Sequence, residues 1–394
     1  MSSVTNTLFK ITTFGESHGK AIGVVIDGCP AGLELNLKEI QNQLNRRKPG
    51  QSILTTQRKE KDEFEILSGI YEGKTLGTPI CFLVYNTDIK SDDYLRWADL
   101  YRPSHADYSY HAKYGYRTPI GGGRASVRET IGRVIAGSVA EQILRKDLGI
   151  ETIAWVESIG KIESNTIQNP PKSKEEVDRS PVRCPNLEIS ETMVKEIEKI
   201  KKEGDSIGGI IGVIIRNVPP GLGEPVFDKL DAELAKACLS IPACKGFENG
   251  SGFAGTKLKG SEHNDEFYIP DKENQEIQDM HKRKIKRISG IKNILDLKTK
   301  TNNSGGIQGG ISNGMPILLK LAFKPTATIH KMQKTVSESG EVVNLLAGGR
   351  HDPCVLPRAV PIVESVVNLV LIDMYFRQRA IYPEWWEKYV KKNQ

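Results

Sequence analysis

The chain has 394 residues and a formal net charge of +6, with 38% hydrophobic and 26% charged residues. This length allows one large core or two closely packed cores. The modest excess of basic residues is compatible with anionic small molecules and with nucleic acid, and it does not decide between them. The first residues lack the pattern of a signal peptide, and no stretch approaches the roughly 20 apolar residues of a membrane span. We therefore expect a soluble, cytoplasmic protein that contacts no membrane.

The cysteines are scattered along the chain and form no CxxC pair. This spacing argues against a structural zinc site, and we expect no bound metal. It favours a reducing compartment in which the cysteines fill the core. The six residues are Cys29, Cys81, Cys184, Cys238, Cys244 and Cys354.

A histidine near the amino terminus is placed for chemistry. Residues 20–27 have the pattern of a buried strand, and the sequence GESHG at 15–19 precedes it. His18 would then lie between glycines at a strand edge, where Glu16 and Ser17 can orient its ring. A lone histidine is nevertheless more often structural than catalytic, so this motif alone decides nothing.

A short amphipathic helix is predicted to follow a capping box formed by Asn36 and Glu39. It ends in basic residues that include Arg47, and basic residues at a helix C-terminus are explained simply by the helix dipole. The polar stretch at 55–65 that follows is predicted to be a loop or a sheet edge.

The segment 101–133 contains more reactive and charged side chains than a purely structural segment needs. It also includes the predicted start of a helix. Ser126 and Glu129 fit a second capping box, which predicts a helix from about 127 to 149. Small residues at 136–140 leave room for another helix to pack closely against it.

The residues before this helix predict an anion site. Three consecutive glycines at 121–123 let the backbone approach a ligand closely. Arg124 and Arg128 flank the helix N-terminus, whose free N–H groups favour negative charge. A capped helix with solvated arginines is the simpler alternative when this stretch is considered by itself.

The rest of the chain alternates regular elements with loops. A Pro-rich, charged stretch at 165–185 and a basic insert at about 271–299 are expected at the surface, and glycine-rich loops at 241–255 and 301–314. The last helix, at 359–376, is apolar on all sides and should be buried in the core. Further elements are expected at 65–71, 79–86, 191–202, 207–218, 228–239 and 316–323.

Several common motifs are absent from the sequence. It contains no P-loop, no GxGxxG fingerprint after a strand, no HExxH and no GxSxG. We therefore do not expect a nucleotide bound by one of the common nucleotide-binding motifs. An RNA-binding protein would interleave basic residues with aromatic ones, and the densest basic run, near His281, is poor in aromatic residues. We therefore expect no nucleic-acid partner.

Four motifs occur in register along the chain. They are GESHG, RPSHADY, GGGRASVRET and GRHDPC, accompanied by IPACKGFE and NNSGGIQGGISNG. From residue 9 to about 379 the chain resembles the chorismate synthase family, and four motifs together are far more specific than one. The resemblance implies an α+β fold, a β-α-β sandwich with long central helices between two antiparallel sheets. It also implies a single domain over residues 1–394 and a homotetramer.

The activity implied by the resemblance is that of a shikimate pathway lyase. Such enzymes convert 5-enolpyruvylshikimate 3-phosphate to chorismate by 1,4-elimination of phosphate, with reduced FMN as cofactor. A phosphate and two carboxylates on the substrate agree with a pocket rich in arginine. A flavin-dependent lyase acting on another phosphorylated cyclic acid is the alternative. NADPH would be needed as a reductant only if the enzyme is bifunctional and reduces its own flavin. Otherwise a separate flavin reductase supplies the electrons.

The resemblance also implies roles for individual residues. His18 and His105 match the catalytic histidines, Asp352 matches a carboxylate that assists proton removal, and Ser17 and Ser126 match hydrogen-bond partners. The implied substrate clamps are Arg47, Arg102, Arg128 and Arg350. The implied flavin contacts are Arg124, Ala125, Ser126, Pro242, Ala243, Gly309, Lys324, Pro325, Thr326, Ala327, Thr328 and Arg350.

Three positions depart from the family pattern. Ile53 stands where many relatives carry an arginine, which puts one anion contact and any nicotinamide binding nearby in doubt. Ser104 replaces the glycine of the usual PGHAD, and Val127 replaces the alanine of the usual SARE. Both of these residues adjoin expected site residues.

Overall fold

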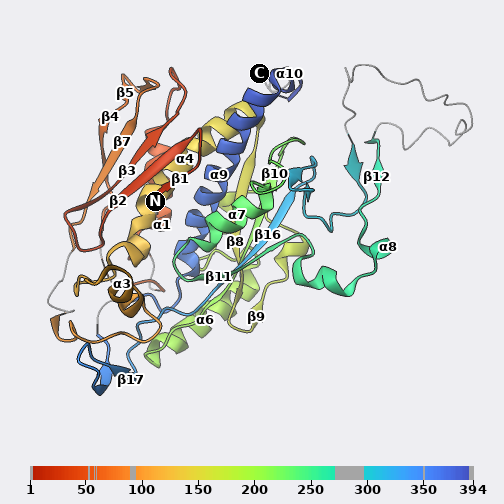
Figure 1. The fold of residues 1–394 in the computed structure, drawn as a ribbon. Coiled ribbons are helices and arrows are strands. Elements are labelled where there is room, and N and C mark those ends of the chain that lie inside the picture. Colours follow the sequence, from red (N-terminus) through yellow and green to blue (C-terminus); the bar gives the residue numbers. More distant parts are fainter. Residues whose placement is uncertain are drawn as a thin grey trace, which may run out of the picture.

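The computed structural model of the chain describes residues 3–51, 54–56, 58, 60–88, 95–270, 297–348 and 351–389. Its framework consists of two five-stranded sheets. The long helices α4 (Thr130–Leu148) and α9 (Leu356–Ile381) run between them (Figure 1). The α+β sandwich expected from the sequence is confirmed.

The first sheet is formed by the amino-terminal part of the chain. Its neighbouring strands are antiparallel, and β3 pairs with both β2 and β7. Alternate β-branched side chains of β3, among them Val24, are fully buried on the side that meets α4, as a period of two requires. In spatial order the strands are β1 (Val4–Thr5), β2 (Lys10–Gly15), β3 (Ala21–Asp27), β7 (Ile80–Tyr85) and β4 (Phe64–Ser68).

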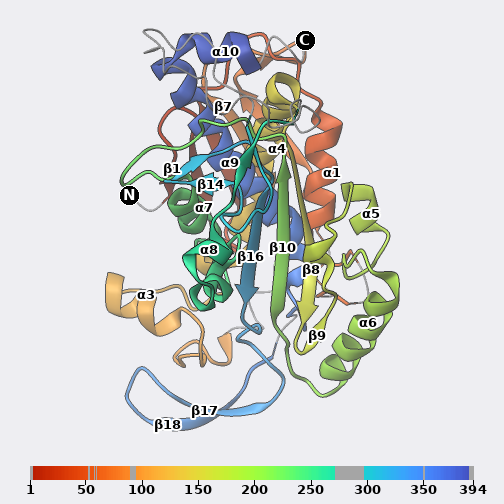
Figure 2. The same cartoon turned by 90° about the vertical axis from the view of Figure 1, so that its right-hand side faces the viewer.

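The second sheet is formed by the middle and carboxy-terminal parts of the chain, and it is also antiparallel. Figure 2 shows its three long strands side by side. One face packs on the central helices. Part of the other face carries a small second cluster around Trp155 and Val177. In spatial order the strands are β11 (Cys244–Asn249), β16 (Ile317–Phe323), β10 (Gly209–Arg216), β8 (Glu151–Ile159) and β9 (Ile162–Glu163).

The two central helices pack very closely, as the small residues of α4 predicted. A Cβ atom added at Gly137 would lie 2.5 Å from the side chain of Ser365 on α9, so only glycine permits this approach. α9 is buried from Leu356 to Tyr375, which confirms the core helix expected at 359–376.

By length and composition α9 could also span a membrane, a feature that the sequence expectation missed. Its apolar 18-residue window has a mean hydropathy of 1.7, but 94% of that window is buried within the fold. This is the environment of a core helix.

The other helices surround the sandwich. They are α1 (Leu37–Arg47), α3 (Asp107–Tyr114), α5 (Lys174–Asp178), α6 (Leu187–Lys202), α7 (Leu230–Leu239), α8 (Gly260–His263) and α10 (Pro383–Tyr389). Short 3-10 turns are η1 (Gly123–Ala125), η2 (Val127–Glu129), η3 (Thr166–Gln168) and η4 (Gly252–Lys257).

Four two-stranded ribbons complete the described structure. They are β5 (Ile70–Tyr71) with β6 (Lys74–Thr75), β12 (Phe267–Tyr268) with β13 (Lys298–Thr299), β14 (Ile307–Gln308) with β15 (Ile311–Ser312), and β17 (Met332–Val336) with β18 (Val342–Leu346). The ribbon β17–β18 and helix α3 lie at the same end of the molecule (Figures 1 and 2).

Only half of the first predicted capping box forms, because the Asn36 backbone N–H donates to Gln142 Oε1 at 2.8 Å and not to Glu39, and the second box is wrong. Asn36 accepts a hydrogen bond from the Glu39 backbone N–H at the start of α1. The Ser126 hydroxyl instead accepts from the Arg128 N–H and caps the 3-10 turn η2, and α4 begins only at Thr130. The Glu129 side chain pairs with Arg133 at 2.7 Å, one helical turn further on.

A stretch expected at the surface, and the stretch predicted to be a loop or a sheet edge, are both partly buried. The segment 165–185 contains η3 and α5, and its Val177, Val182 and Cys184 are in the core. In the polar stretch at 55–65, Glu60 and Asp62 are buried as well. Most of the basic insert, residues 271–296, lies outside the described residues, and its flanks pair as β12 and β13.

Candidate functional site

A cavity of about 350 Å³ lies where several loops and helix ends converge. The residues that line it come from the β2–β3 turn, the 101–133 segment, the loop after β16 and the start of α9. The lining includes Ser17, His18, Arg58, Arg102, Ser104, His105, Ala125, Ser126, Arg128, Pro242, Ala243, Lys324, Pro325, Thr326, Ala327, Thr328, His351, Asp352 and Arg358. Fifteen of the positions expected from the sequence therefore meet in one place.

His18 is held by its neighbour and by the glycine loop. The Ser17 hydroxyl lies 3.0 Å from His18 Nδ1, and Ser17 is itself buried. A Cβ atom at Gly121 would lie 2.1 Å from the same ring nitrogen, and Gly121 has a φ of +72°. The first of the three glycines thus brings the backbone against the histidine ring.

His105 belongs to a network centred on Asp107. Its Nδ1 lies 2.9 Å from Asp107 Oδ1, and Arg102 donates to both carboxylate oxygens at 2.7 and 2.8 Å. Burial opposes ionisation of Asp107, but these hydrogen bonds outweigh it and hold its pKa far below the usual range. The carboxylate therefore stays charged and fixes both side chains.

Ser104, which replaces a glycine of the family pattern, adopts a φ of +60°. This is the left-handed region that favours glycine. Its hydroxyl and carbonyl oxygens both accept hydrogen bonds from Lys324 Nζ, at 3.0 and 2.9 Å. The substitution therefore adds one contact across the cavity while it keeps the turn.

Asp352 lies at the base of the cavity, immediately before α9. Its Oδ1 accepts a hydrogen bond of 2.9 Å from the Thr56 backbone N–H, and its Oδ2 accepts one from Arg358. The Thr326 hydroxyl donates to its backbone carbonyl at 2.9 Å. The position of this carboxylate is therefore set by three separate segments of the chain.

The loop 324–328 and the pair Pro242 and Ala243 form a neighbouring wall. The Lys324 backbone N–H donates to the Ala243 carbonyl at 2.9 Å, and Ser206 Oγ donates to the Thr326 carbonyl at 2.8 Å. The wall carries the ammonium group of Lys324, whose positive charge suits a phosphorylated ligand.

Not every expected residue reaches this cavity. Arg47 is completely buried behind it, and burial together with neighbouring arginines lowers its pKa to about 10, although Asp62 opposes that shift. Arg124 lines a second cavity of about 430 Å³ on the other side of His105, where it donates to Thr13 Oγ1 at 2.7 Å. Gly309 lies in the turn between β14 and β15, away from both cavities.

Two expectations cannot be compared with the structure, because Arg350 and Ile53 lie outside the described residues. Val127, the third departure from the family pattern, lines the cavity and accepts a hydrogen bond from Arg47 through its backbone carbonyl. A change from alanine to valine leaves that backbone contact intact.

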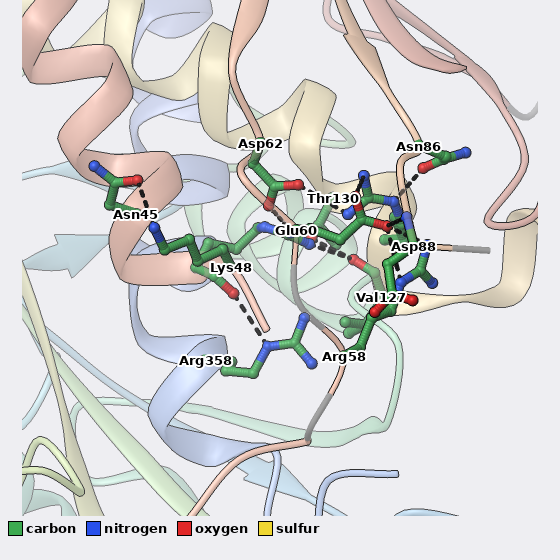
Figure 3. Close-up of polar contacts among 12 residues, drawn as sticks. Asn45, Lys48, Arg58, Glu60, Asp62, Asn86, Asp88, Val127, Thr130 and Arg358 are labelled. Carbon is green, nitrogen blue, oxygen red and sulfur yellow. Dashed lines mark hydrogen bonds and ion pairs between the residues drawn. The ribbon is translucent and has the colours of Figure 1, made fainter. Parts of the chain in front are cut away.

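Sequence reasoning missed a buried charge network beside the cavity. Arg58 and Arg358 line the cavity, and two buried carboxylates lie behind it (Figure 3). Glu60 binds Arg58 and Arg128, and Asp62 binds Arg47 and Arg128. The signal that could have revealed the network is the spacing of Arg58, Glu60 and Asp62, which are each two residues apart. The residues that follow Glu60 and Asp62, namely Lys61 and Glu63, are exposed. Such alternation indicates a segment with one buried face.

The geometry defines an enzyme-type site for a small ligand with several negative charges, in which three histidines and the Asp352 carboxylate line one arginine-rich cavity. Comparisons with known proteins agree with this class. The sequence model of the chorismate synthase family matches residues 9–376. The chain is 54% identical to the chorismate synthase of Leptospira biflexa over 394 residues, covering 100% of this chain and 99% of that protein.

It is also 55% identical to the chorismate synthase of a Synechocystis strain, covering 96% and 99% of the two chains. A crystal structure of chorismate synthase has 30% sequence identity and a TM-score of 0.72, and the match covers 98% of each chain. The chain belongs to the chorismate synthase family. The family expected from the four motifs is thereby confirmed, and with it a lyase of the shikimate pathway.

Proposed function

We propose that this protein converts 5-enolpyruvylshikimate 3-phosphate to chorismate and inorganic phosphate in a reaction that requires reduced FMN. The observation that carries the proposal is the convergence of His18, His105 and Asp352 on one cavity lined with arginine. A 1,4-elimination removes a phosphate and one ring proton, so it needs cations where the phosphate leaves and a base where the proton leaves.

The histidines act on the leaving group in this proposal. A protonated imidazole at His18 or His105 stabilises the charge that develops on the departing phosphate oxygen. Ser17 orients the first ring and Asp107 the second. Asp352 accepts the proton at its carboxylate, which Thr56 and Arg358 hold in place.

The cofactor would be held by the wall formed by residues 324–328 with Pro242 and Ala243, together with Ala125 and Ser126 across the cavity. Reduced FMN supplies electron density for the elimination when it is bound. NADPH is required only if the protein reduces its own flavin, and a separate flavin reductase is the other source of electrons.

We also propose a homotetramer in the cytoplasm. Gly309 matches a flavin contact of the family, yet it lies on the β14–β15 turn outside the cavity. A contact from that turn would therefore come from a second copy of the chain. Large apolar side chains are exposed elsewhere on the chain, with Phe227 at 89% and Phe253 at 77%, and subunit contacts would cover them.

The test is an anaerobic assay of the purified protein with 5-enolpyruvylshikimate 3-phosphate and dithionite-reduced FMN. Chorismate and phosphate should appear in equal amounts and only with reduced flavin. A folded protein that binds FMN and releases no chorismate would refute the proposal and favour another phosphorylated cyclic acid as substrate. Replacing dithionite with NADPH tests for a built-in reductase, and light scattering of the purified protein gives the number of subunits.

A further inference from the structure

Arg58 is a cation of the cavity that the motifs did not single out. It lies on the segment before β4, lines the cavity, and donates from Nη2 to the backbone carbonyl of Ser17 at 3.3 Å. That carbonyl immediately precedes His18. A ligand group held by Arg58 would therefore lie on the His18 side of the cavity.

The guanidinium of Arg58 is fixed by Glu60. Oε1 of Glu60 accepts from Arg58 Nε at 3.0 Å and from Arg58 Nη2 at 2.7 Å. The other oxygen, Oε2, accepts from the backbone N–H and the hydroxyl of Thr87 at 3.0 and 2.7 Å. It also lies 3.4 Å from Arg128 Nη2. One carboxylate thus joins two arginines of the cavity to the end of β7.

Burial and charge make Glu60 a rigid support. Its side chain is 0% exposed. Burial raises the cost of its charge, but Arg128, Thr87 and Arg58 together lower its pKa below the ordinary value. A buried carboxylate whose oxygens are saturated by hydrogen bonds holds its partners in fixed positions.

Arg47 and Arg128 are more deeply buried than Arg58. All three nitrogens of Arg128 are engaged by the protein, through Asn86, Asp62, Glu60 and the Tyr85 carbonyl, and its side chain is only 4% exposed. Arg47 is 0% exposed and lies 2.5 Å from Asp62. Arg58 retains 15% of its side-chain exposure at the cavity.

We propose that Arg58 binds an oxyanion of the substrate and that Glu60 is its positioning residue, because it holds Arg58 and Arg128 through one carboxylate (Figure 3). The oxyanion is a phosphate or a carboxylate, since a guanidinium recognises both. The inference deepens the proposed function and rests on it. It adds Arg58 to Arg102 and Arg128, the substrate-binding arginines implied by the resemblance that also line the cavity.

The experiment compares matched variants from the same segment. Arg58→Gln and Lys61→Gln each remove one positive charge, and Glu60→Gln and Glu63→Gln each remove one negative charge. Lys61 and Glu63 are exposed. Binding of 5-enolpyruvylshikimate 3-phosphate to the protein with oxidised FMN is measured by calorimetry, FMN affinity by fluorescence, and kcat and KM with reduced FMN.

We expect Arg58→Gln to raise the Kd and KM of the substrate by about tenfold to a hundredfold, the effect of one charge-assisted hydrogen bond. FMN affinity should stay within about twofold, and Lys61→Gln and Glu63→Gln should behave like the wild type. Arg58→Lys should restore part of the affinity. A substrate Kd within about twofold of wild type in Arg58→Gln would overturn the proposal.

The role of Glu60 is tested by a double-mutant cycle. Glu60→Gln should raise KM more than it lowers kcat, and this effect should be much smaller in the Arg58→Gln background, where only the contact with Arg128 is lost. Equal effects of Glu60→Gln in both backgrounds would refute positioning through Arg58. If Glu60→Gln does not fold, Glu60→Asp takes its place in the cycle.

Two competitors identify the oxyanion. Weaker inhibition of Arg58→Gln by inorganic phosphate assigns Arg58 to the phosphate, and weaker inhibition by shikimate assigns it to the carboxylate. Unchanged inhibition by both would contradict the proposal. Because binding is measured without turnover, a wild-type protein that binds the substrate without forming chorismate would refute the proposed function and leave the Arg58 comparison intact.

Discussion

Nδ1 of His105 lies 2.9 Å from Oδ1 of Asp107, two residues further along the chain at the start of α3. A proton on Nδ1 is donated to this carboxylate, and Nε2 then faces the glycine loop, 3.5 Å from the place of a Cβ atom at Gly122. Arg102 donates to the same Oδ1 through Nη2 and to Oδ2 through Nε. Asp107 therefore orients a histidine and an arginine of the cavity together.

This arrangement predicts the effect of Asp107→Asn. The amide cannot accept from His105 and Arg102 at once without placing its own NH₂ group against one of them, so both side chains lose their fixed positions. We expect kcat to fall by about tenfold to a hundredfold while FMN binding is kept. Asp99→Asn, a change of the same kind at an exposed carboxylate, is the control. Wild-type turnover in Asp107→Asn would contradict this role of the carboxylate.

Gly121→Ala tests the contact between the glycine loop and His18. The added methyl group would lie 2.1 Å from His18 Nδ1, so the ring must move. We expect a loss of about a hundredfold in kcat, as for a comparable displacement of a catalytic group. Gly115→Ala is the matched control, because Gly115 has a similar φ of +68° and nothing within 4 Å of the added atom. Both variants should lose about 1 kcal/mol of stability, and equal kcat values in the two would refute the contact.

The framework of this fold was predictable from local patterns. A helix that is apolar on all sides can only lie in a core, and α9 does so from Leu356 to Tyr375. The small residues of α4 predicted a close helix pair, and Gly137 packs against Ser365. The start of α4 was predicted three residues too early, because Ser126 caps a 3-10 turn whose hydrogen bonds differ from those of an α-helix.

Site residues were predictable from the sequence only where they belong to a recognisable motif. His18, His105 and Asp352 come from three motifs, and the fold brings them to one cavity. The burial of Glu60 and Asp62 was missed because the stretch that contains them is polar. No local sequence pattern indicates that buried arginines from α1 and η2 will form ion pairs with it. Long-range ion pairs of this kind depend on the whole topology and leave only a weak spacing signal in the sequence.

The stability of the protein should depend on His351 at mildly acidic pH. Burial lowers the pKa of His351 below its ordinary value of 6.5, Arg102 and His330 add to this, and the hydrogen bond to the Gly348 carbonyl opposes it. The unfolded chain then binds a proton near pH 6.5 that the folded chain does not bind, so stability falls as the pH drops from about 7 to about 5. His351→Gln should flatten this fall in urea denaturation. Identical slopes for His351→Gln and the wild type would contradict the prediction.

Glu364→Gln, a substitution within α9, should lower the free energy of unfolding of the protein. The Glu364 side chain is 2% exposed, lies 2.5 Å from Arg46 Nη1, and accepts the Ala154 backbone N–H at 3.2 Å. Arg46 and Lys174 outweigh the cost of burial and keep its pKa low, so the carboxylate is charged at neutral pH. Removing that charge leaves the mostly buried Arg46 with one acidic partner fewer, which costs about 3 kcal/mol of stability.

Urea denaturation measures the change, with the exposed Glu191→Gln of α6 as the control. Because Glu364 does not line the cavity, KM should stay near the wild-type value at temperatures where the variant is folded. A loss of stability no larger than that of Glu191→Gln would show that the pair contributes nothing beyond a surface charge.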